Sequence, residues 1–110
     1  MTASYIVRYQ GYADDKTAFI NHYRNNHAPI LENFPGIKAL VLHHAADFQD
    51  PHPITPGGNL LIAEMKFQDI SALNIALKSD VRSDARTDFA NFPEFYGEVT
   101  HQAFQSEKVF

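Results

Sequence analysis

Cysteine is absent from the 110 residues of the sequence. The chain can therefore form no disulfide framework, no thiolate nucleophile and no cysteine-based metal site. None of its apolar runs approaches the roughly 18 residues that indicate a membrane-spanning helix, so no membrane partner is expected. The first ten residues, MTASYIVRYQ, lack the basic start and long apolar run of a signal peptide. Together these absences predict a cytoplasmic protein.

Positive charge is also scarce. Nine basic residues stand against thirteen acidic ones, which gives a formal charge of −4. The basic residues are scattered, so the sequence predicts no nucleic-acid partner. It also lacks the histidine and carboxylate spacing of metal sites, glycine-rich phosphate loops and the nucleophile elbow of serine hydrolases. We therefore expect no metal ion.

The order of strand-like and helix-like patterns predicts a single domain over residues 1–110 with an α+β fold. Strands are expected at 4–10, 37–44, 59–67 and 95–104, and a loop at 45–58. Helices are expected after a cap at Asp14 or Asp15 and after a cap at Asp69, the latter over 69–79 and 81–92. This order is ferredoxin-like, βαββαβ, with a four-stranded antiparallel sheet and both helices on one face.

Two of these strands are apolar on both faces. ALVL (39–42) and LLIAEM (60–65) are nearly continuous hydrophobic runs, whereas a strand with one wet face alternates apolar and polar residues. The helices cover only one face of the sheet. The sequence therefore predicts a homodimer in which the second copy covers the other face; the alternative is that 59–67 is simply a buried central strand.

The segment HYRNNHAPIL (22–31) places a histidine on the apolar side of a helix. At about 100° per residue, His27 falls within the apolar arc of residues 19–34, whereas His22 projects to the opposite, polar side. Pro29 lacks an N–H and crowds the carbonyl of Asn25, so it should move Ala28 out of the α region and break or kink the helix near 25–28.

His27 is the first candidate for chemistry. An imidazole with an ordinary pKa near 6.5 can exchange a proton at neutral pH, as a general acid or base must. The alternative is a structural core histidine that is hydrogen-bonded to a backbone carbonyl.

Aromatic side chains predict a pocket between helices and sheet for a small, largely apolar ligand with one or two oxygen functions. The expected substrate-binding residues are Tyr5, Tyr9, Phe19, Tyr23, Phe92 and Asp88; the alternative is that the aromatic rings only fill the core. Asp88 projects onto the apolar side of its helix, so its carboxylate needs a partner, which is expected to be a helix N-terminus, Arg8 or His27.

The remaining histidines give weaker signals. His43 and His44 are neighbours on a strand and point to opposite faces, so they cannot readily share a metal and are expected in the core or an interface. His52 lies between two prolines on the 45–58 loop. It either covers the mouth of a pocket or is an ordinary exposed loop residue.

The sequence resembles the EthD family along nearly its whole length. FINHYRNNHAPILENFPGI (19–37) is similar to the family signature of an aromatic residue, His-x-Pro and then Pro-Gly. AEMKFQDISAL (63–73) and DFANF (88–92) are similar to its third strand, second helix and Asp-x-x-x-Phe segment. The resemblance implies a dimeric α+β barrel of ferredoxin-like subunits that works without metal or organic cofactor. It also implies an acid/base role for His27, and an assisting catalytic role for His52, as in isomerase relatives.

Three functions follow as hypotheses. The first is a cofactor-independent enzyme of isomerase or lyase type that moves protons on a cyclic or aromatic-catabolism intermediate. The second is a non-catalytic accessory protein that binds such a molecule in a degradation pathway such as that of ethyl tert-butyl ether. The third is a haem-binding or haem-degrading barrel, which the absence of tryptophan and the lack of a ligand-like histidine context disfavour.

Overall fold

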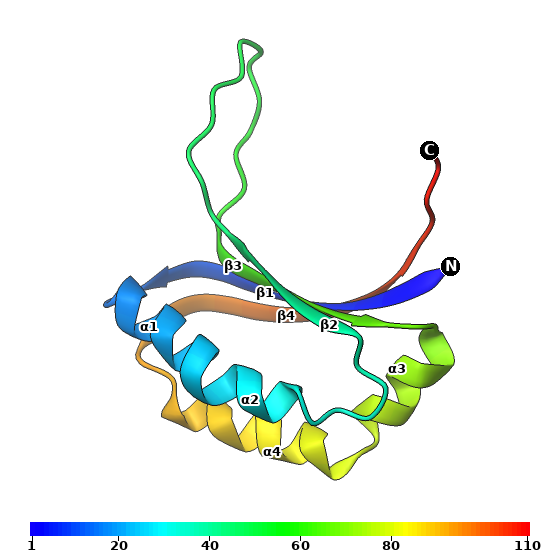
Figure 1. The fold of residues 1–110 in the computed structure, drawn as a ribbon. Helices are drawn as coiled ribbons and strands as arrows, with labels where there is room; N and C mark the ends of the chain where they lie inside the picture. Colours follow the sequence, from blue (N-terminus) through cyan, green and yellow to red (C-terminus); the bar gives the residue numbers. More distant parts are fainter.

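A computed structural model describes residues 1–110 as one antiparallel sheet with helices on one of its faces (Figure 1). The strands are β1 (Thr2–Ala13), β2 (Ala39–His44), β3 (Asn59–Phe67) and β4 (Phe95–Ser106), in the spatial order β2-β3-β1-β4. The helices are α1 (Lys16–His22), α2 (Ala28–Leu31), α3 (Ile70–Leu77) and α4 (Asp80–Asp88). This is the expected ferredoxin-like arrangement. No helix has the length and apolar character needed to cross a membrane.

Local signals in the sequence set the starts of two helices. The carboxylate of Asp15 accepts a hydrogen bond from the backbone N–H of Ala18 at 3.0 Å, and that of Asp69 accepts one from Ala72 at 2.8 Å. Each carboxylate satisfies an N–H group that has no partner within its helix. Both expected caps are therefore confirmed, and Asp15 rather than Asp14 takes the first position.

Alternating residues of the strands build the core between sheet and helices. In β1, Ala3, Val7 and Tyr9 are buried, and Tyr9 pairs with Leu61 of β3. The core is completed from both layers by apolar side chains, chiefly Phe19, Ile20, Tyr23, Leu31, Phe34, Leu61, Ala63, Met65, Phe67, Leu73, Ala76 and Ala85.

The first and last strands are longer than the sequence pattern indicates. β1 and β4 stay paired as far as Ala13 and Phe95, through a position where Gly11 faces Gly97. Both glycines have positive φ, near 143° and 141°, and a Cβ on either would lie 2.0 Å from a carbonyl oxygen of the other strand. Only glycine allows this close approach. Because glycine carries no hydrophobic signal, the extension of β1 beyond Gln10 escaped prediction, whereas the start of β4 at Phe95 was predicted.

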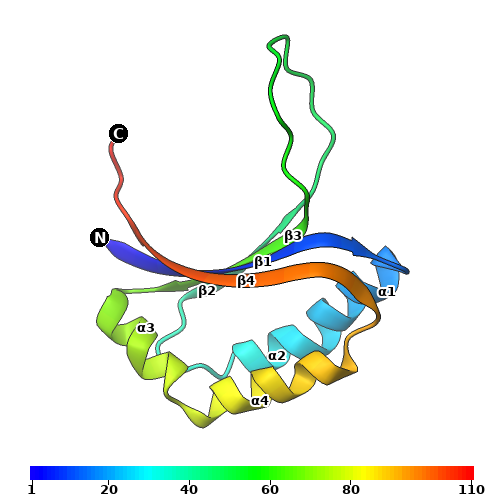
Figure 2. The same cartoon turned by 180° about the vertical axis from the view of Figure 1, so that it is seen from behind.

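The second face of the sheet carries no helix. The loop 45–58 and the C-terminal end of the chain rise on that side (Figures 1 and 2). The alternation of side chains places Ile6, Val41, Leu60, Ile62 and Phe104 on this face, and each is partly exposed. Ser4 donates a hydrogen bond to Glu64 at 2.7 Å on the same face. We call this surface the open face.

A break or kink is expected near residues 25–28, but the structure shows a different kind of irregularity. Residues Tyr23–His27 make a π-helical turn between α1 and α2, in which the N–H of Ala28 donates to the carbonyl of Tyr23. Ala28 keeps α-helical angles, with φ −56° and ψ −42°, so Pro29 does not move it out of the α region. The wider π turn relieves the clash that a proline ring makes with a carbonyl four residues earlier. The helix is therefore widened rather than interrupted.

Candidate active site

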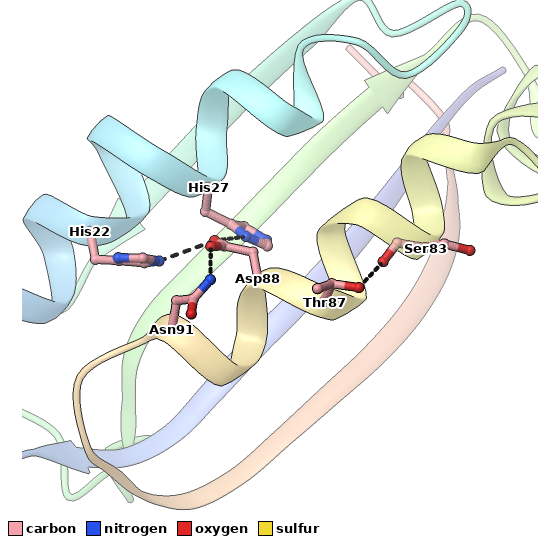
Figure 3. Close-up of polar contacts among 6 residues, drawn as sticks. All are labelled: His22, His27, Ser83, Thr87, Asp88 and Asn91. Atoms are coloured by element: carbon pink, nitrogen blue, oxygen red, sulfur yellow. Dashed lines mark hydrogen bonds and ion pairs between the residues drawn. The ribbon is translucent and has the colours of Figure 1, made fainter.

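Asp88, near the end of α4, joins two histidines of the facing helical segment (Figure 3). The Nδ1 atom of His27 lies 2.9 Å from Asp88 Oδ2, and the Nε2 atom of His22 lies 3.0 Å from the same oxygen. The side-chain amide of Asn91 donates to the other oxygen, Oδ1, at 3.2 Å. His27 is only 3% exposed. Of the three partners expected for Asp88, the structure therefore selects His27.

His22 is a correction to the sequence-based expectation. It was expected to face solvent, but its side chain is 14% exposed and contacts Asp88. Residues five apart in an α-helix point about 140° away from each other, whereas a π turn brings residues i and i+5 onto one side. The π turn at Tyr23–His27 therefore turns His22 and His27 toward the same carboxylate.

The carboxylate is held in its ionised form. Burial alone would raise the pKa of Asp88, but the hydrogen bonds from His27, Asn91 and His22 outweigh burial and lower the pKa below its ordinary value. Because an ionised carboxylate only accepts hydrogen bonds, the nitrogens of His27 and His22 that face it must carry protons.

His27 is held neutral. Its burial lowers the pKa below the ordinary 6.5, and the opposing effect of Asp88 does not restore it. A neutral imidazole carries one proton, and on His27 that proton lies on Nδ1, toward Asp88. The second nitrogen, Nε2, forms no hydrogen bond within the chain and retains a lone pair that can accept a proton.

These directions predict that acid destabilises the fold. Unfolded histidines take up protons near pH 6.5, whereas folded His27 and His101, whose pKa values are lowered mainly by burial, resist protonation. The unfolded state then binds more protons, so the free energy of unfolding should fall as pH drops from 7 to 5. Urea titrations across this range measure it. His27→Gln should flatten the slope; a wild-type stability that is flat or rises toward pH 5 would contradict the assignment.

An aromatic cavity of about 490 Å³ lies beside this cluster. Tyr9, Phe19 and Phe92 line it, as expected, together with Phe89 and Phe95. Neither His27 nor Asp88, which was expected to bind substrate, lines it.

Two of the lining rings stand next to the histidine. The ring of Phe92 lies 5.0 Å from that of His27, and the ring of Phe89 lies 5.5 Å from it. These two phenylalanines therefore form the partition between the cavity and His27.

The other expected site residues lie in different places. Tyr23 is buried 5.0 Å from the His27 ring, and Tyr5 packs at 5.9 Å against His101; neither lines the cavity. Burial raises the pKa of Tyr9 and of Tyr23, so both stay protonated. His52 is exposed on the loop that rises from the open face, away from the helices (Figure 1). One chain alone does not bring His52 to His27.

His43 and His44 are both exposed and not in the core of this chain. His43 contacts Glu64 on the open face at 3.0 Å, and His44 lies 3.4 Å from Arg24. Arg8, the alternative partner for Asp88, donates instead to Gln102, on the open face. No group of three or more histidine, cysteine or carboxylate side chains is arranged to hold a metal ion.

Sequence reasoning missed Arg86 and His101, which also line the cavity, and Asn91, which binds Asp88. A signal for His101 was present. It stands two residues from Val99 and from Ala103, and all three pair with the core-facing positions of β1. Side chains of a strand alternate between its two faces, so pairing the last strand with the first would have placed His101 on the face toward the helices.

Comparison with protein-family models gives no match, and comparison with curated proteins gives none. Solved structures do match. A protein of the ethyl tert-butyl ether degradation (EthD) family from Bacillus halodurans superimposes with a TM-score of 0.76 and 24% identity, over 97% of this chain and 100% of that one. The fold is that of EthD proteins. An EthD-like protein from Ralstonia eutropha gives a TM-score of 0.71 at 12% identity, over 98% and 96% of the two chains.

The same EthD-like fold occurs in oxygenases. SnoaB, a cofactor-independent oxygenase from Streptomyces nogalater, matches with a TM-score of 0.66 and 15% identity over 98% of this chain and 95% of that one. These structural matches confirm the fold expected from the EthD resemblance. Because the sequence identities are below 25%, they show the fold alone.

Proposed function

We propose that this EthD-like protein is a cofactor-independent enzyme that transfers a proton on a small cyclic or aromatic molecule, with His27 as the acid/base. The observation that carries the proposal is the buried His27–Asp88 pair, with Nδ1 and Oδ2 2.9 Å apart, beside an aromatic cavity. An acid/base group needs a pKa near the working pH and a fixed orientation, and Asp88 supplies the orientation.

The chemistry follows from the tautomer. Nε2 of His27 accepts a proton from a C–H or O–H group of the substrate, and the imidazolium that forms is stabilised by the adjacent carboxylate of Asp88. The proton then returns from Nε2 to another atom of the substrate, which completes an isomerisation or elimination. Because Phe89 and Phe92 separate the cavity from His27, a bound substrate must displace one of these rings.

Two relatives in fold support a small-molecule enzyme. SnoaB is a cofactor-independent oxygenase, and a monooxygenase from Streptomyces coelicolor was solved with nanaomycin D bound. The accessory-protein function is the second candidate, and the phenylalanine partition favours it, because a ligand in the cavity as it stands does not touch His27.

A ligand screen separates these two functions. Small lactones, hydroxyquinones and phenolic acids would be screened by thermal shift, and each hit would then be incubated with the protein and analysed by mass spectrometry and NMR. We expect at least one hit to be converted or to exchange a carbon-bound proton with D₂O. Binding by several hits with neither conversion nor exchange would favour the accessory protein.

We also propose that two copies pair through the open face. Partly exposed apolar side chains gather there, and the face lies between the 45–58 loop and the C-terminal end (Figure 2). A second copy would bury this surface about a two-fold axis. Ser4 and Glu64, whose hydrogen bond lies on this face, would then be enclosed in the interface.

Ile62→Glu tests the dimer. A charge in the centre of the open face should give monomer, or a large loss of stability, because association and folding are linked. Light scattering at micromolar concentration measures the mass. The matched control is Ile75→Glu on α3, where the wild-type side chain is already 64% exposed; it should leave the dimer intact. A wild-type protein that is a folded monomer would contradict the pairing.

A further inference from the structure

The wall of the aromatic cavity contains an arginine, Arg86, that forms no ion pair. Arg86 lines the cavity, Arg82 lies one turn earlier on α4, and neither forms an ion pair. Instead, each guanidinium lies over an aromatic ring: Arg86 over Phe89 at 5.7 Å, and Arg82 over Tyr5 at 5.8 Å. A guanidinium stacked in this way keeps N–H groups free for an oxygen acceptor.

His101 belongs to the same wall. Its ring lines the cavity and lies 6.3 Å from the ring of Phe89. Its Nε2 atom is buried and has no hydrogen-bond partner in the chain, a state that costs free energy until a ligand supplies the partner. Burial, followed by the charges of Arg82 and Arg86, lowers the pKa of His101, so that at neutral pH the ring can donate or accept one hydrogen bond.

The rest of the cavity lining indicates which chemical groups a ligand would carry besides an anionic one. Most of it is aromatic or aliphatic, and the cavity volume of about 490 Å³ is in the range of small-molecule sites. Its one carboxylate belongs to Glu94, which is exposed, as Arg86 is, and the two side chains form no ion pair. The cavity therefore offers a large apolar surface with one polar wall, formed by the cationic Arg86 and the neutral His101.

We propose that the cavity binds a planar aromatic carboxylate, with its rings against the phenylalanines and its carboxylate on Arg86 and His101. The planar guanidinium matches a carboxylate in two parallel hydrogen bonds. This inference rests on the proposed function, since it names the substrate class of the same site, but it concerns binding and not turnover.

Two probes with the same ring system test whether the cavity recognises a negatively charged group. 2-Naphthoate carries the carboxylate, and 2-naphthamide replaces it with a neutral amide of similar shape. By isothermal titration calorimetry, wild-type protein should bind 2-naphthoate at least about tenfold more tightly, and added NaCl should narrow that gap. Equal affinity for the two probes, or no binding of 2-naphthoate, would overturn the proposal.

Substitutions test whether Arg86 is the side chain that recognises the carboxylate of 2-naphthoate. Arg86→Gln should weaken 2-naphthoate about tenfold and leave 2-naphthamide unchanged, whereas Arg86→Lys should restore part of the difference. Arg24→Gln is the matched control, because Arg24 is an exposed arginine that does not line this cavity; it should change neither affinity. Equal weakening of both probes by Arg86→Gln, or the same loss in Arg24→Gln, would remove the subsite.

The result is independent of catalysis. Neither probe needs to react, so a preference for 2-naphthoate stands even if His27 transfers no proton. Conversely, conversion of a neutral ligand by a protein that binds both probes equally would support the proposed function and overturn the anion subsite.

Discussion

His27→Gln should lower the turnover of a converted ligand by about 10²–10⁴-fold and leave its affinity nearly unchanged. Glutamine keeps much of the volume of histidine and can still donate to Asp88, but it does not titrate. Stopped assays on a hit from the ligand screen give turnover, and calorimetry gives affinity.

The control for His27→Gln is His44→Gln, which removes an exposed histidine outside the cavity and should not alter turnover. A purely structural His27 behaves differently: the variant would lose about 1–3 kcal/mol of stability, and activity would follow only the folded fraction. Full turnover by a stable His27→Gln protein would remove His27 from the mechanism. A comparable loss in His52→Gln would mean that the loop of a second copy reaches the site.

Asp88→Asn should lower the free energy of unfolding at pH 7 by about 2–3 kcal/mol, because an ionised acceptor of several hydrogen bonds becomes a neutral amide. In the variant, the amide oxygen can take the place of Oδ2 and still accept from His27 and His22. The amide NH₂ then faces the side-chain amide of Asn91, which donates to Oδ1 in the wild type, so that hydrogen bond is lost or Asn91 must turn. Turnover should fall as well, since the imidazolium that forms on His27 is no longer stabilised by a negative charge. Urea titration and the same stopped assay give the two effects.

Asp84→Asn is the matched control for Asp88→Asn, because Asp84 is an exposed aspartate on the same helix that forms no ion pair. It should change stability by less than about 0.5 kcal/mol. An Asp88→Asn protein as stable and active as Asp84→Asn would show that the carboxylate neither holds nor orients His27.

Most of the fold could be predicted from the spacing of hydrophobic residues and from the residues that cap helices. The β3 boundaries, Asn59–Phe67, follow directly from an apolar run bounded by turn residues, and Asp69 begins its helix as its side chain dictates. The extension of β1 beyond Gln10 depends on how Gly11 and Gly97 meet. That pairing is a property of two distant segments, and no local pattern in either one predicts it.

The site was predictable only in part. His27 and Asp88 each stood out as a polar residue on an apolar helix face, a signal contained within one segment. The role of His22 depends on the π turn, and a projection at 100° per residue assumes that the helix is regular. Arg86 and His101 meet only when α4 and β4 pack together, so their joint place in the cavity is a tertiary fact.

The protonation state of His27 tests the central claim most directly, and it requires no substrate. Long-range ¹H–¹⁵N NMR of the histidine rings reports the tautomer and the pKa of each. The structure predicts that His27 is neutral at pH 7 with its proton on Nδ1, and that it titrates below its ordinary value of 6.5. A proton on Nε2 at pH 7, or a pKa at or above 6.5, would contradict the account of His27 as a base oriented by Asp88.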